Sequence, residues 1–216
     1  MPRFSILALA LLAWVAAALP AAAQRGGTPG EFDFYVLALS WSPGYCDSDR
    51  GGRSAQCEPG RKLGFVVHGL WPQFERGYPS SCRSGSNPSS RVLDEIRDLY
   101  PDSGLARHEW RTHGTCSGLP PAEYFAAVRR ARDKVAIPDP LVGMERGGET
   151  TPQNLERAFA AVNPGLRPDM MSVTCSRSAL REVRVCLDRD LRNFRPCPEV
   201  DRNACRFGPI QIGAPR

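Results

Sequence analysis

Runs of apolar residues in the first half of the chain predict two strands. The segment from Phe32 to Trp41 is rich in aromatic and branched side chains and is followed by Ser42-Pro43-Gly44, a sequence that is typical of a turn. A second apolar run extends from Leu63 to Leu70 and places His68 near its end. Short runs that are apolar at consecutive positions are typical of strands covered on both faces, so we expect both to be buried.

The last quarter of the chain predicts three short strands. They are the segments Met171 to Cys175, Leu180 to Leu187 and Ile210 to Ile212. Within the second of these, Glu182 and Arg184 alternate with valines, which is typical of a half-buried strand.

Helical spacing of apolar residues, together with a compact histidine motif, predicts helices between these two groups of strands. They are the segments Ser90 to Tyr100, His108 to His113, Pro121 to Val135 and Pro152 to Val162. Polar segments rich in small residues predict loops at Gln24 to Gly30, Cys46 to Gly60, Phe74 to Ser90 and Gly143 to Thr151. The sequence contains no internal repeat or interdomain linker. We therefore predict a single α+β domain, with a mostly antiparallel central sheet packed with several helices.

The segment Met1 to Ala23 has the pattern of a secretory signal peptide. Arg3 supplies the positive start, residues 6–19 are almost entirely apolar, and three alanines form a cleavage site. A membrane anchor is the alternative, but the apolar core is shorter than the roughly 20 residues that a span needs, and Pro20 interrupts it. We expect a secreted or periplasmic protein that has no membrane attachment after cleavage, with its mature domain at residues 24–216.

Eight cysteines lie in this mature part of the chain. They are Cys46, Cys57, Cys82, Cys116, Cys175, Cys186, Cys197 and Cys205. An even number of cysteines in an exported chain predicts a disulfide framework, although the sequence alone leaves the pairing open. Metal binding is the alternative, but no pair has the C-x-x-C spacing of a zinc knuckle.

The charge balance of the chain is mildly basic. The 28 Lys and Arg residues minus the 23 Asp and Glu residues give +5, and only Lys62 and Lys134 are lysines. Arginine binds phosphate groups bidentately, which suits an anionic polymer. The codon usage of a GC-rich genome explains the same composition and suggests a bacterial source. The charge therefore permits a nucleic-acid substrate without demonstrating one.

The three histidines of the chain lie in two compact motifs. His68 occurs in Phe-Val-Val-His-Gly-Leu-Trp-Pro-Gln (residues 65–73), and the other two occur in His-Glu-Trp-Arg-Thr-His-Gly-Thr-Cys (residues 108–116). Histidine exchanges protons near neutral pH, so this concentration predicts general acid–base chemistry. On a helix, Glu109 and His113 are i and i+4 and share one face, with His108 one step round.

A zinc protease is the alternative interpretation of the second motif. It requires two histidines at i and i+4 with a glutamate between them, whereas His108 and His113 are five residues apart and diverge by about 140° on an ideal helix. We therefore predict no metal site and no cofactor. Gly114 is expected to end the helix, and Cys116 is expected to hold that end in place through a disulfide.

With both motifs described, the chain resembles the ribonuclease T2 family of secreted endoribonucleases. Residues 65–72 match the first histidine motif of the family, and residues 108–110 and 113–116 match most of the second. The resemblance extends over nearly the whole mature chain. It implies the disulfides Cys82–Cys116 and Cys186–Cys197, the latter nested inside Cys175–Cys205, which leaves Cys46 for Cys57.

The resemblance also implies a mechanism, the metal-free cleavage of single-stranded RNA by transphosphorylation in a monomeric enzyme. His113 is then the base that removes the proton from the ribose 2′-hydroxyl, and His68 is the acid that protonates the departing 5′-oxygen. His108 holds the phosphate, and Glu109 stabilises the transition state or orients its neighbours. The product is a 2′,3′-cyclic phosphate, which is hydrolysed more slowly. DNA is excluded because it lacks the attacking hydroxyl.

Five further residues are candidates for binding the RNA: Trp71, Phe74, Tyr78, Arg111 and Thr112. Aromatic side chains stack on bases, each stack contributing about 1–3 kcal/mol. The alternative is that Trp71 packs in the wall of the site, while Phe74 and Tyr78 pin their loop to the core.

One departure from the family concerns Thr112. The family usually places a lysine immediately before the last histidine of the second motif, where it neutralises charge on the phosphorane, and Thr112 supplies no charge. Arg111 leaves the helix about 100° away from Thr112. The alternative function is therefore a catalytically weakened relative that acts as a secreted RNA-binding or interaction protein. A disulfide-rich extracellular binding module with structural histidines is the other alternative.

Overall fold

The structure, a computed structural model, describes residues 24–48, 54–82, 86–206 and 208–215. The predicted signal peptide, residues 1–23, lies outside the described residues. The strands are β1 (Gln24–Arg25), β2 (Phe34–Trp41), β3 (Phe65–Gln73), β4 (Pro79–Ser80), β5 (Gly148–Thr150), β6 (Met171–Ser176), β7 (Ala179–Leu187) and β8 (Ile210–Ile212). The α-helices are α1 (Ser42–Cys46), α2 (Ser90–Asp94), α3 (Ser103–Thr112), α4 (Pro121–Lys134), α5 (Pro152–Val162) and α6 (Pro198–Asp201). Single 3₁₀ turns are η2 (Ala55–Cys57), η3 (Gly114–Ser117), η4 (Asp139–Leu141) and η5 (Pro168–Met170).

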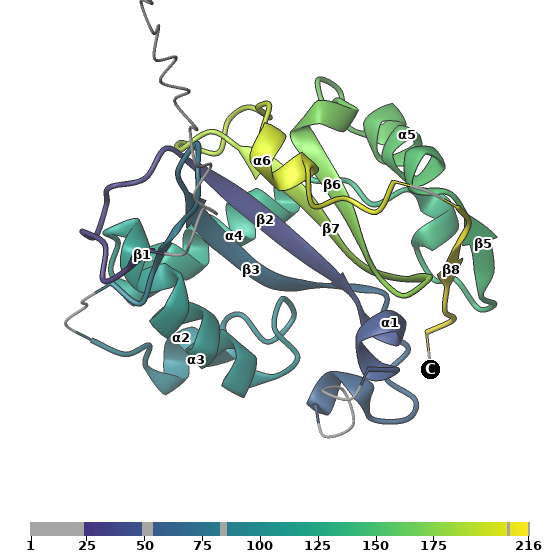
Figure 1. Ribbon diagram of the computed structural model, residues 1–216. Helices are drawn as coiled ribbons and strands as arrows, with labels where there is room; N and C mark the ends of the chain where they lie inside the picture. The colour runs from purple at the N-terminus through teal and green to yellow at the C-terminus, as the bar shows by residue number, and fades with distance from the viewer. Residues whose placement is uncertain (1–23, 49–53, 83–85, 207, 216) are drawn as a thin grey trace, which may run out of the picture.

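A six-stranded sheet forms the centre of the molecule (Figure 1). Its strand order is β3-β2-β7-β8-β5, and β6 pairs with β7 beside this path. Every pair is antiparallel except β7 with β8, so the predicted α+β fold with a mostly antiparallel sheet is confirmed. The separate pair β1 and β4 is parallel. This pair connects the segment after the predicted signal peptide, which was predicted to be a loose loop, to the long loop after β3.

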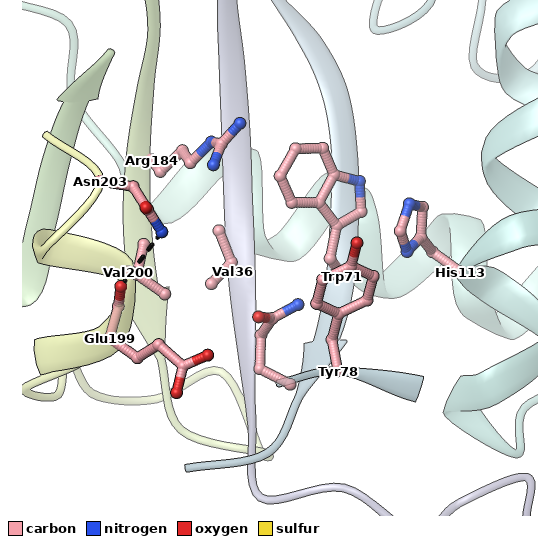
Figure 2. Close-up of a pocket in the computed structure, with 9 residues that line it drawn as sticks. Val36, Trp71, Tyr78, His113, Arg184, Glu199, Val200 and Asn203 are labelled. Atoms are coloured by element: carbon pink, nitrogen blue, oxygen red, sulfur yellow. Dashed lines mark hydrogen bonds between the residues drawn. The ribbon is translucent and has the colours of Figure 1, made fainter. Parts of the chain in front are cut away.

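One face of the sheet carries the polar residues. Val36 on β2 is in register with Trp71 on β3, and Ala38 on β2 is in register with Arg184 on β7. Since side chains alternate between faces, these residues share one face, and Figure 2 shows Val36, Trp71 and Arg184 around one pocket. Helix α6 packs against this face through Val200. Polar groups and a pocket thus occupy this side of the sheet.

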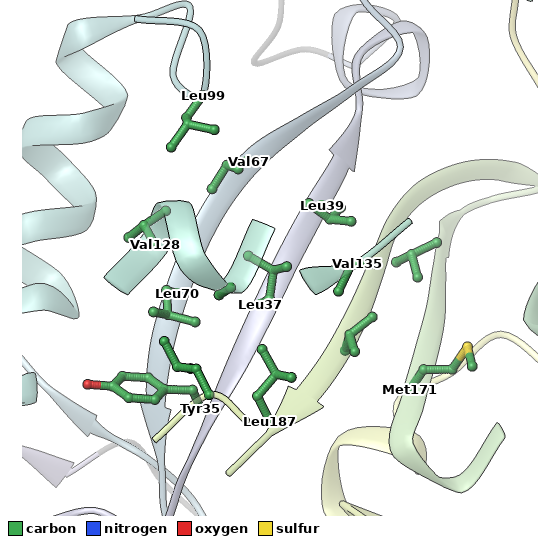
Figure 3. Packing of buried hydrophobic residues seen from close by; sticks show 14 of the residues in the cluster. Tyr35, Leu37, Leu39, Val67, Leu70, Leu99, Val128, Val135, Met171 and Leu187 are labelled. Carbon is green, nitrogen blue, oxygen red and sulfur yellow. The ribbon is translucent and has the colours of Figure 1, made fainter. Parts of the chain in front are cut away.

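The opposite face of the sheet is the hydrophobic core (Figure 3). Leu37 and Leu39 of β2 are fully buried there, with Leu70 of β3 and Val185 of β7. Helix α4 covers them, and its Val128 is also fully buried. A fully buried side chain of this size contributes roughly 1.5–3 kcal/mol relative to exposure, so this face provides most of the stability. The polar face can therefore bear charged groups without loss of the core.

Helices α4 and α5 confirm the sequence predictions within one residue at each end. Pro121 occupies the first turn of α4, where its missing N–H costs nothing, and Lys134 lies in the last turn, where a cation complements the helix dipole. Thr151 caps α5 by accepting a hydrogen bond from the backbone N–H of Asn154 (3.2 Å). Local signals at both ends determine these helices.

The prediction for Ser90 to Tyr100 is only partly correct. Helix α2 ends at Asp94, and the chain continues in tight turns that include an i to i+3 bond from Leu99 N to Ile96 O (3.0 Å). The carbonyl of Leu99 accepts a bond from Val67 of β3 (3.3 Å), which ties this segment to the sheet. Leu93, Ile96 and Leu99 are nevertheless buried, as their spacing predicts, while Val92 is half-buried.

Other segments predicted to be turns or loops also contain regular structure, including the 3₁₀ turn η2 in the predicted loop at Cys46 to Gly60. Ser42-Pro43-Gly44 begins the short helix α1, with proline in its first turn. The predicted loop at Gly143 to Thr151 contains β5, which pairs with the distant strand β8 near the C-terminus. The predicted loop at Phe74 to Ser90 contains β4. Pairings between distant segments decide the two strands, and local composition does not reveal them.

Four disulfides hold the loops and the C-terminal segment, and all eight cysteines are in the described residues. The pairs are Cys46–Cys57, Cys82–Cys116, Cys175–Cys205 and Cys186–Cys197. They are the pairs that the family resemblance implies. Cys82–Cys116 joins the loop after β4 to the turn that follows α3, and so braces the second histidine motif. In the part of the chain that the structure covers, no helix is long and apolar enough to cross a membrane.

Candidate active site

His68 lies in the middle of β3, at an irregularity in the strand pairing. Ala38 of β2 is opposite Gly69, but Leu39 is opposite Val67, so His68 is an extra residue without a partner. Regular alternation would place His68 on the core face with Leu70. An extra residue of this kind, a β-bulge, redirects a side chain, and here the imidazole contacts groups of the polar face. The sequence analysis placed His68 near the end of a strand; the strand in fact continues to Gln73.

Gly69 and Trp71 complete the first motif through Glu109 of α3. The indole Nε1 of Trp71 donates a hydrogen bond to Glu109 Oε2 (2.7 Å). A Cβ atom on Gly69 would lie 2.1 Å from that oxygen and 2.2 Å from the indole nitrogen. Only glycine therefore allows strand and helix to approach closely enough for this bond.

Helix α3 presents Glu109 and His113 to the sheet. Asp102 caps its N-terminus by accepting a bond from Gly104 N (2.8 Å), and Glu109 is buried, with 1% exposure. The backbone N–H of His113 donates to the Glu109 carbonyl (2.9 Å), so the expected i, i+4 relation holds. Gly114 follows, not to provide a left-handed turn but because a Cβ there would lie 2.5 Å from the indole of Trp110.

The imidazole of His68 lies between two carboxylates. Its Nδ1 bonds to Glu182 Oε1 of β7, and its Nε2 lies 3.6 Å from Glu109 Oε1. Burial lowers the pKa of His68, but the bond to Glu182 and the charges of both carboxylates outweigh that effect and raise the pKa above 6.5. The side chain is still 34% exposed, so a substrate can reach it. The two carboxylates therefore favour the imidazolium form of His68.

The imidazole of His113 has the opposite preference. Burial, with the nearby charges of His68 and His108, lowers its pKa to about 3. Its Nδ1 is buried and finds no hydrogen-bond partner among the described residues. Burial also raises the pKa of the Glu109 carboxyl to about 7, although His68 and Trp71 oppose the change. His113 is consequently neutral at neutral pH, and its surroundings disfavour the protonated ring.

Both imidazoles pack against one indole ring. The ring centroid of Trp71 lies 5.2 Å from that of His68 and 5.3 Å from that of His113. The guanidinium of Arg184 lies 5.0 Å from the same ring, and Tyr78 lies 6.3 Å from His113. Trp71 therefore fixes the spacing between the two candidate proton carriers.

A pocket of about 310 Å³ opens beside this cluster (Figure 2). Its lining residues are Val36, Trp71, Gln73, Tyr78, His113, Arg184, Glu199, Val200 and Asn203. Figure 2 shows His113 on one side of the pocket and the α6 residues on the other. The pocket thus extends from His113 to residues on and just after α6, and neither His68 nor His108 lines it.

The predicted binding residues are distributed unevenly around this site. Trp71 and Tyr78 line the pocket, and Tyr78 is 37% exposed. Phe74 packs against the core instead, which is the alternative that the sequence analysis left open. Arg111 is exposed and Thr112 is half-buried, and neither lines the pocket.

His108 is exposed on α3 and does not line the pocket. Burial and the charges of Arg111 and His68 lower its pKa. It lies near enough to the other two histidines to interact electrostatically with both.

Sequence reasoning missed the contributions of Glu182 and Arg184 to the site. The alternation on β7 was interpreted as a half-buried strand with polar residues facing solvent. Instead Glu182 is 5% exposed and Arg184 lines the pocket. The spacing of Glu182 and Arg184 was the signal that could have revealed them. Two charged residues that are two positions apart on a strand share one face and can form a pair there. In the described residues, no group of three or more His, Cys, Asp or Glu side chains is arranged to hold a metal ion.

Comparison with known proteins identifies the family of the chain. The Ribonuclease T2 family matches residues 32–197. A ribonuclease of Aeromonas hydrophila is 38% identical over 197 residues, which cover 90% of this chain and 87% of that protein. Ribonuclease DdI of Dictyostelium discoideum is 28% identical over 195 residues, which cover 82% and 83%. The crystal structure of RNase NT in complex with 5′-AMP has the same fold, with a TM-score of 0.66 and 24% identity over 86% of this chain and 98% of that one. The chain belongs to the ribonuclease T2 family, and this membership supports an endoribonuclease activity.

Proposed function

We propose that the protein is an exported, monomeric endoribonuclease that cleaves single-stranded RNA by metal-free transphosphorylation. The 2′-hydroxyl oxygen attacks the adjacent phosphorus, the bond from phosphorus to the 5′-oxygen breaks, and a 2′,3′-cyclic phosphate remains. Slower hydrolysis then opens the ring. Names of relatives such as the Aeromonas ribonuclease support the substrate class, and the site supports the chemistry.

His113 is the base and His68 the acid in this reaction. The neutral imidazole of His113 accepts the proton of the 2′-hydroxyl, and the imidazolium of His68 gives a proton to the departing 5′-oxygen. One observation carries the proposal: two imidazoles against one indole ring are driven to opposite protonation states by their surroundings. Pairs of titratable groups with separated pKa values mark acid and base assignments.

The remaining groups bind and stabilise. Glu109, buried beside His68, stabilises the phosphorane or orients its neighbours, and the exposed His108 holds the phosphate. The exposed ring of Tyr78 offers a stacking surface for a base. Polar side chains of the pocket lining, such as Gln73 and Asn203, offer donors and acceptors for the edge of that base.

A product analysis tests the proposal. The oxidised protein is incubated in EDTA with a short RNA and with its all-DNA counterpart, and the products are identified by mass spectrometry. RNA fragments that end in 2′,3′-cyclic phosphate, with DNA intact, are the expected result, and light scattering of the same sample should give the mass of one chain. Absence of cleavage from pH 4 to 8, with RNA still bound, would instead favour the weakened, RNA-binding relative.

Replacing Thr112 with lysine should raise kcat by about tenfold. The new ammonium would stabilise the charge on the phosphorane, a kind of contribution that can reach about 10²–10³ in rate when fully preorganised. Thr112 is half-buried and outside the pocket lining, so we expect only part of that gain. Initial rates on a dinucleotide measure the effect. Thr112→Met has similar length without charge, and an equal gain in that variant would refute the electrostatic reason.

Export is the second part of the proposal. Disulfides persist in oxidising compartments, and the structure contains four. When the full-length chain is expressed in a bacterium, N-terminal sequencing of the protein outside the cytoplasm should begin at Gln24. Retention of residues 1–23 in the membrane fraction would indicate an anchor instead.

A further inference from the structure

Strand β7 carries a buried ion pair, Glu182 with Arg184, that contacts His68 of the first histidine motif. Glu182 and Arg184 are two residues apart and lie on the polar face of the sheet. The acid is almost fully buried, with 5% exposure, in register with Ser40 of β2 and Thr174 of β6. Taking a carboxylate out of water is costly unless other charges and hydrogen bonds compensate it, so its partners require an explanation.

Each oxygen of the Glu182 carboxylate has its own cationic partner. Oε1 bonds to Nδ1 of His68, while Oε2 accepts two bonds from Arg184, from Nε (3.0 Å) and Nη2 (2.8 Å). With both N–H groups of the guanidinium on Oε2 and His68 on Oε1, the carboxylate has little freedom to rotate. Arg184 is itself placed by the Trp71 ring, 5.0 Å away. The chain of contacts therefore runs from indole to guanidinium to carboxylate to imidazole.

This arrangement determines which nitrogen of His68 can take part in chemistry. Because Nδ1 faces Glu182, it keeps its hydrogen in both charge states of the ring. Nε2 then faces Glu109 and the centre of the site, 3.6 Å from Oε1. The only proton that His68 can give to a substrate is the one on Nε2.

We propose that Glu182, clamped by Arg184, is a positioning residue that holds the imidazole of His68 in the orientation and charge state required to protonate the leaving group. The role in protonating the leaving group rests on the proposed function. The effect of Glu182 on the orientation and charge of His68 does not. A purely structural ion pair that joins β3 to β7 is the competing explanation.

The charges around His68 make the two explanations distinguishable. Glu182 and Arg184 face it from β7 and Glu109 faces it from α3. His108 on α3 and His113 just after α3 interact with it electrostatically. Burial lowers the pKa of His68 and Glu182 raises it, so removing the Glu182 charge should lower that pKa. An opposite charge at such a distance shifts a pKa by about one to three units.

The test titrates His68 by NMR in the wild type and in Glu182→Gln. The amide still offers an oxygen to Nδ1 but no charge, so we expect the pKa of His68 to fall by about one to three units. The alkaline limb of the kcat/KM profile should move by the same amount. Activity lost in the variant should therefore be smallest in acid and grow with pH, as His68 deprotonates earlier. Glu182→Asp keeps the charge on a shorter side chain, so the pKa of His68 in this variant should lie between the values of Glu182→Gln and the wild type.

A second variant covers the case in which Glu182→Gln does not fold. Arg184→Gln removes a positive charge, and the pKa of His68 should then rise instead of falling. Glu123→Gln, an exposed change on α4, should move neither the titration nor the rate. A His68 pKa unchanged in both β7 variants, or a loss of activity that is equal at every pH, would overturn the proposal in favour of a structural ion pair. NMR needs no turnover, so the two proposals can fail separately. If the wild type forms no cyclic phosphate but both variants shift the pKa of His68 as expected, the proposed function is refuted and the positioning role remains.

Discussion

Replacing His113 with alanine should lower kcat for RNA cleavage by about 10³-fold, because a positioned general base typically contributes 10²–10⁴ in rate. In the proposed reaction the neutral imidazole of His113, which lies against Trp71, accepts the 2′-hydroxyl proton. KM should change little, since the base acts mainly in the transition state. Steady-state kinetics on a dinucleotide provide the measurement, and circular dichroism verifies that the variant is folded.

Two comparisons sharpen this experiment. His68→Ala should cost a similar factor in kcat, and the double variant should cost little more than either change alone, because acid and base act as a unit. His108→Ala should mainly raise KM, as expected for an exposed residue that holds phosphate. Full activity in His113→Ala would defeat the acid–base assignment and restore the interpretation of the histidines as structural.

Replacing Glu109 with alanine should lower kcat by about 10²–10³-fold, the usual loss when one preorganised stabilising group is removed. The side chain is buried, accepts the Trp71 bond at 2.7 Å and lies 3.6 Å from His68. Its loss removes a charge beside the acid and frees the indole that separates the two histidines. Single-turnover rates at saturating RNA measure the chemical step.

Glu109→Gln separates charge from orientation. The amide oxygen can still accept the Trp71 bond, so the indole keeps its place, but the ionisable carboxyl with its raised pKa is absent. We expect this variant to recover part of the activity and to remain at least about tenfold below the wild type. Wild-type kcat in Glu109→Gln would mean that Glu109 only holds Trp71. Glu123→Gln provides the matched control on the surface.

Local sequence patterns predict much of the fold because all the residues that form each pattern lie within a single helix or strand. The limits of α4 and α5 follow from proline in the first turn, a capping threonine and an apolar stripe, all within one helix. The strands β2, β6 and β7 likewise follow from continuous or alternating apolar residues. By contrast β5 exists only because β8 lies beside it, and nothing within Gly148–Thr150 indicates that partner.

By itself the sequence determined the α+β class, the two histidine motifs and the identity of His68, Glu109 and His113 as candidate site residues, because residue type and spacing decide these properties. The tertiary structure alone decided how they work together. A one-residue bulge turns His68 from the core face to the polar face, and β7, more than 100 residues away, brings Glu182 to its Nδ1. Pairing register and burial between distant segments set these contacts and thereby the protonation states, and neither quantity is encoded in any local stretch of the chain.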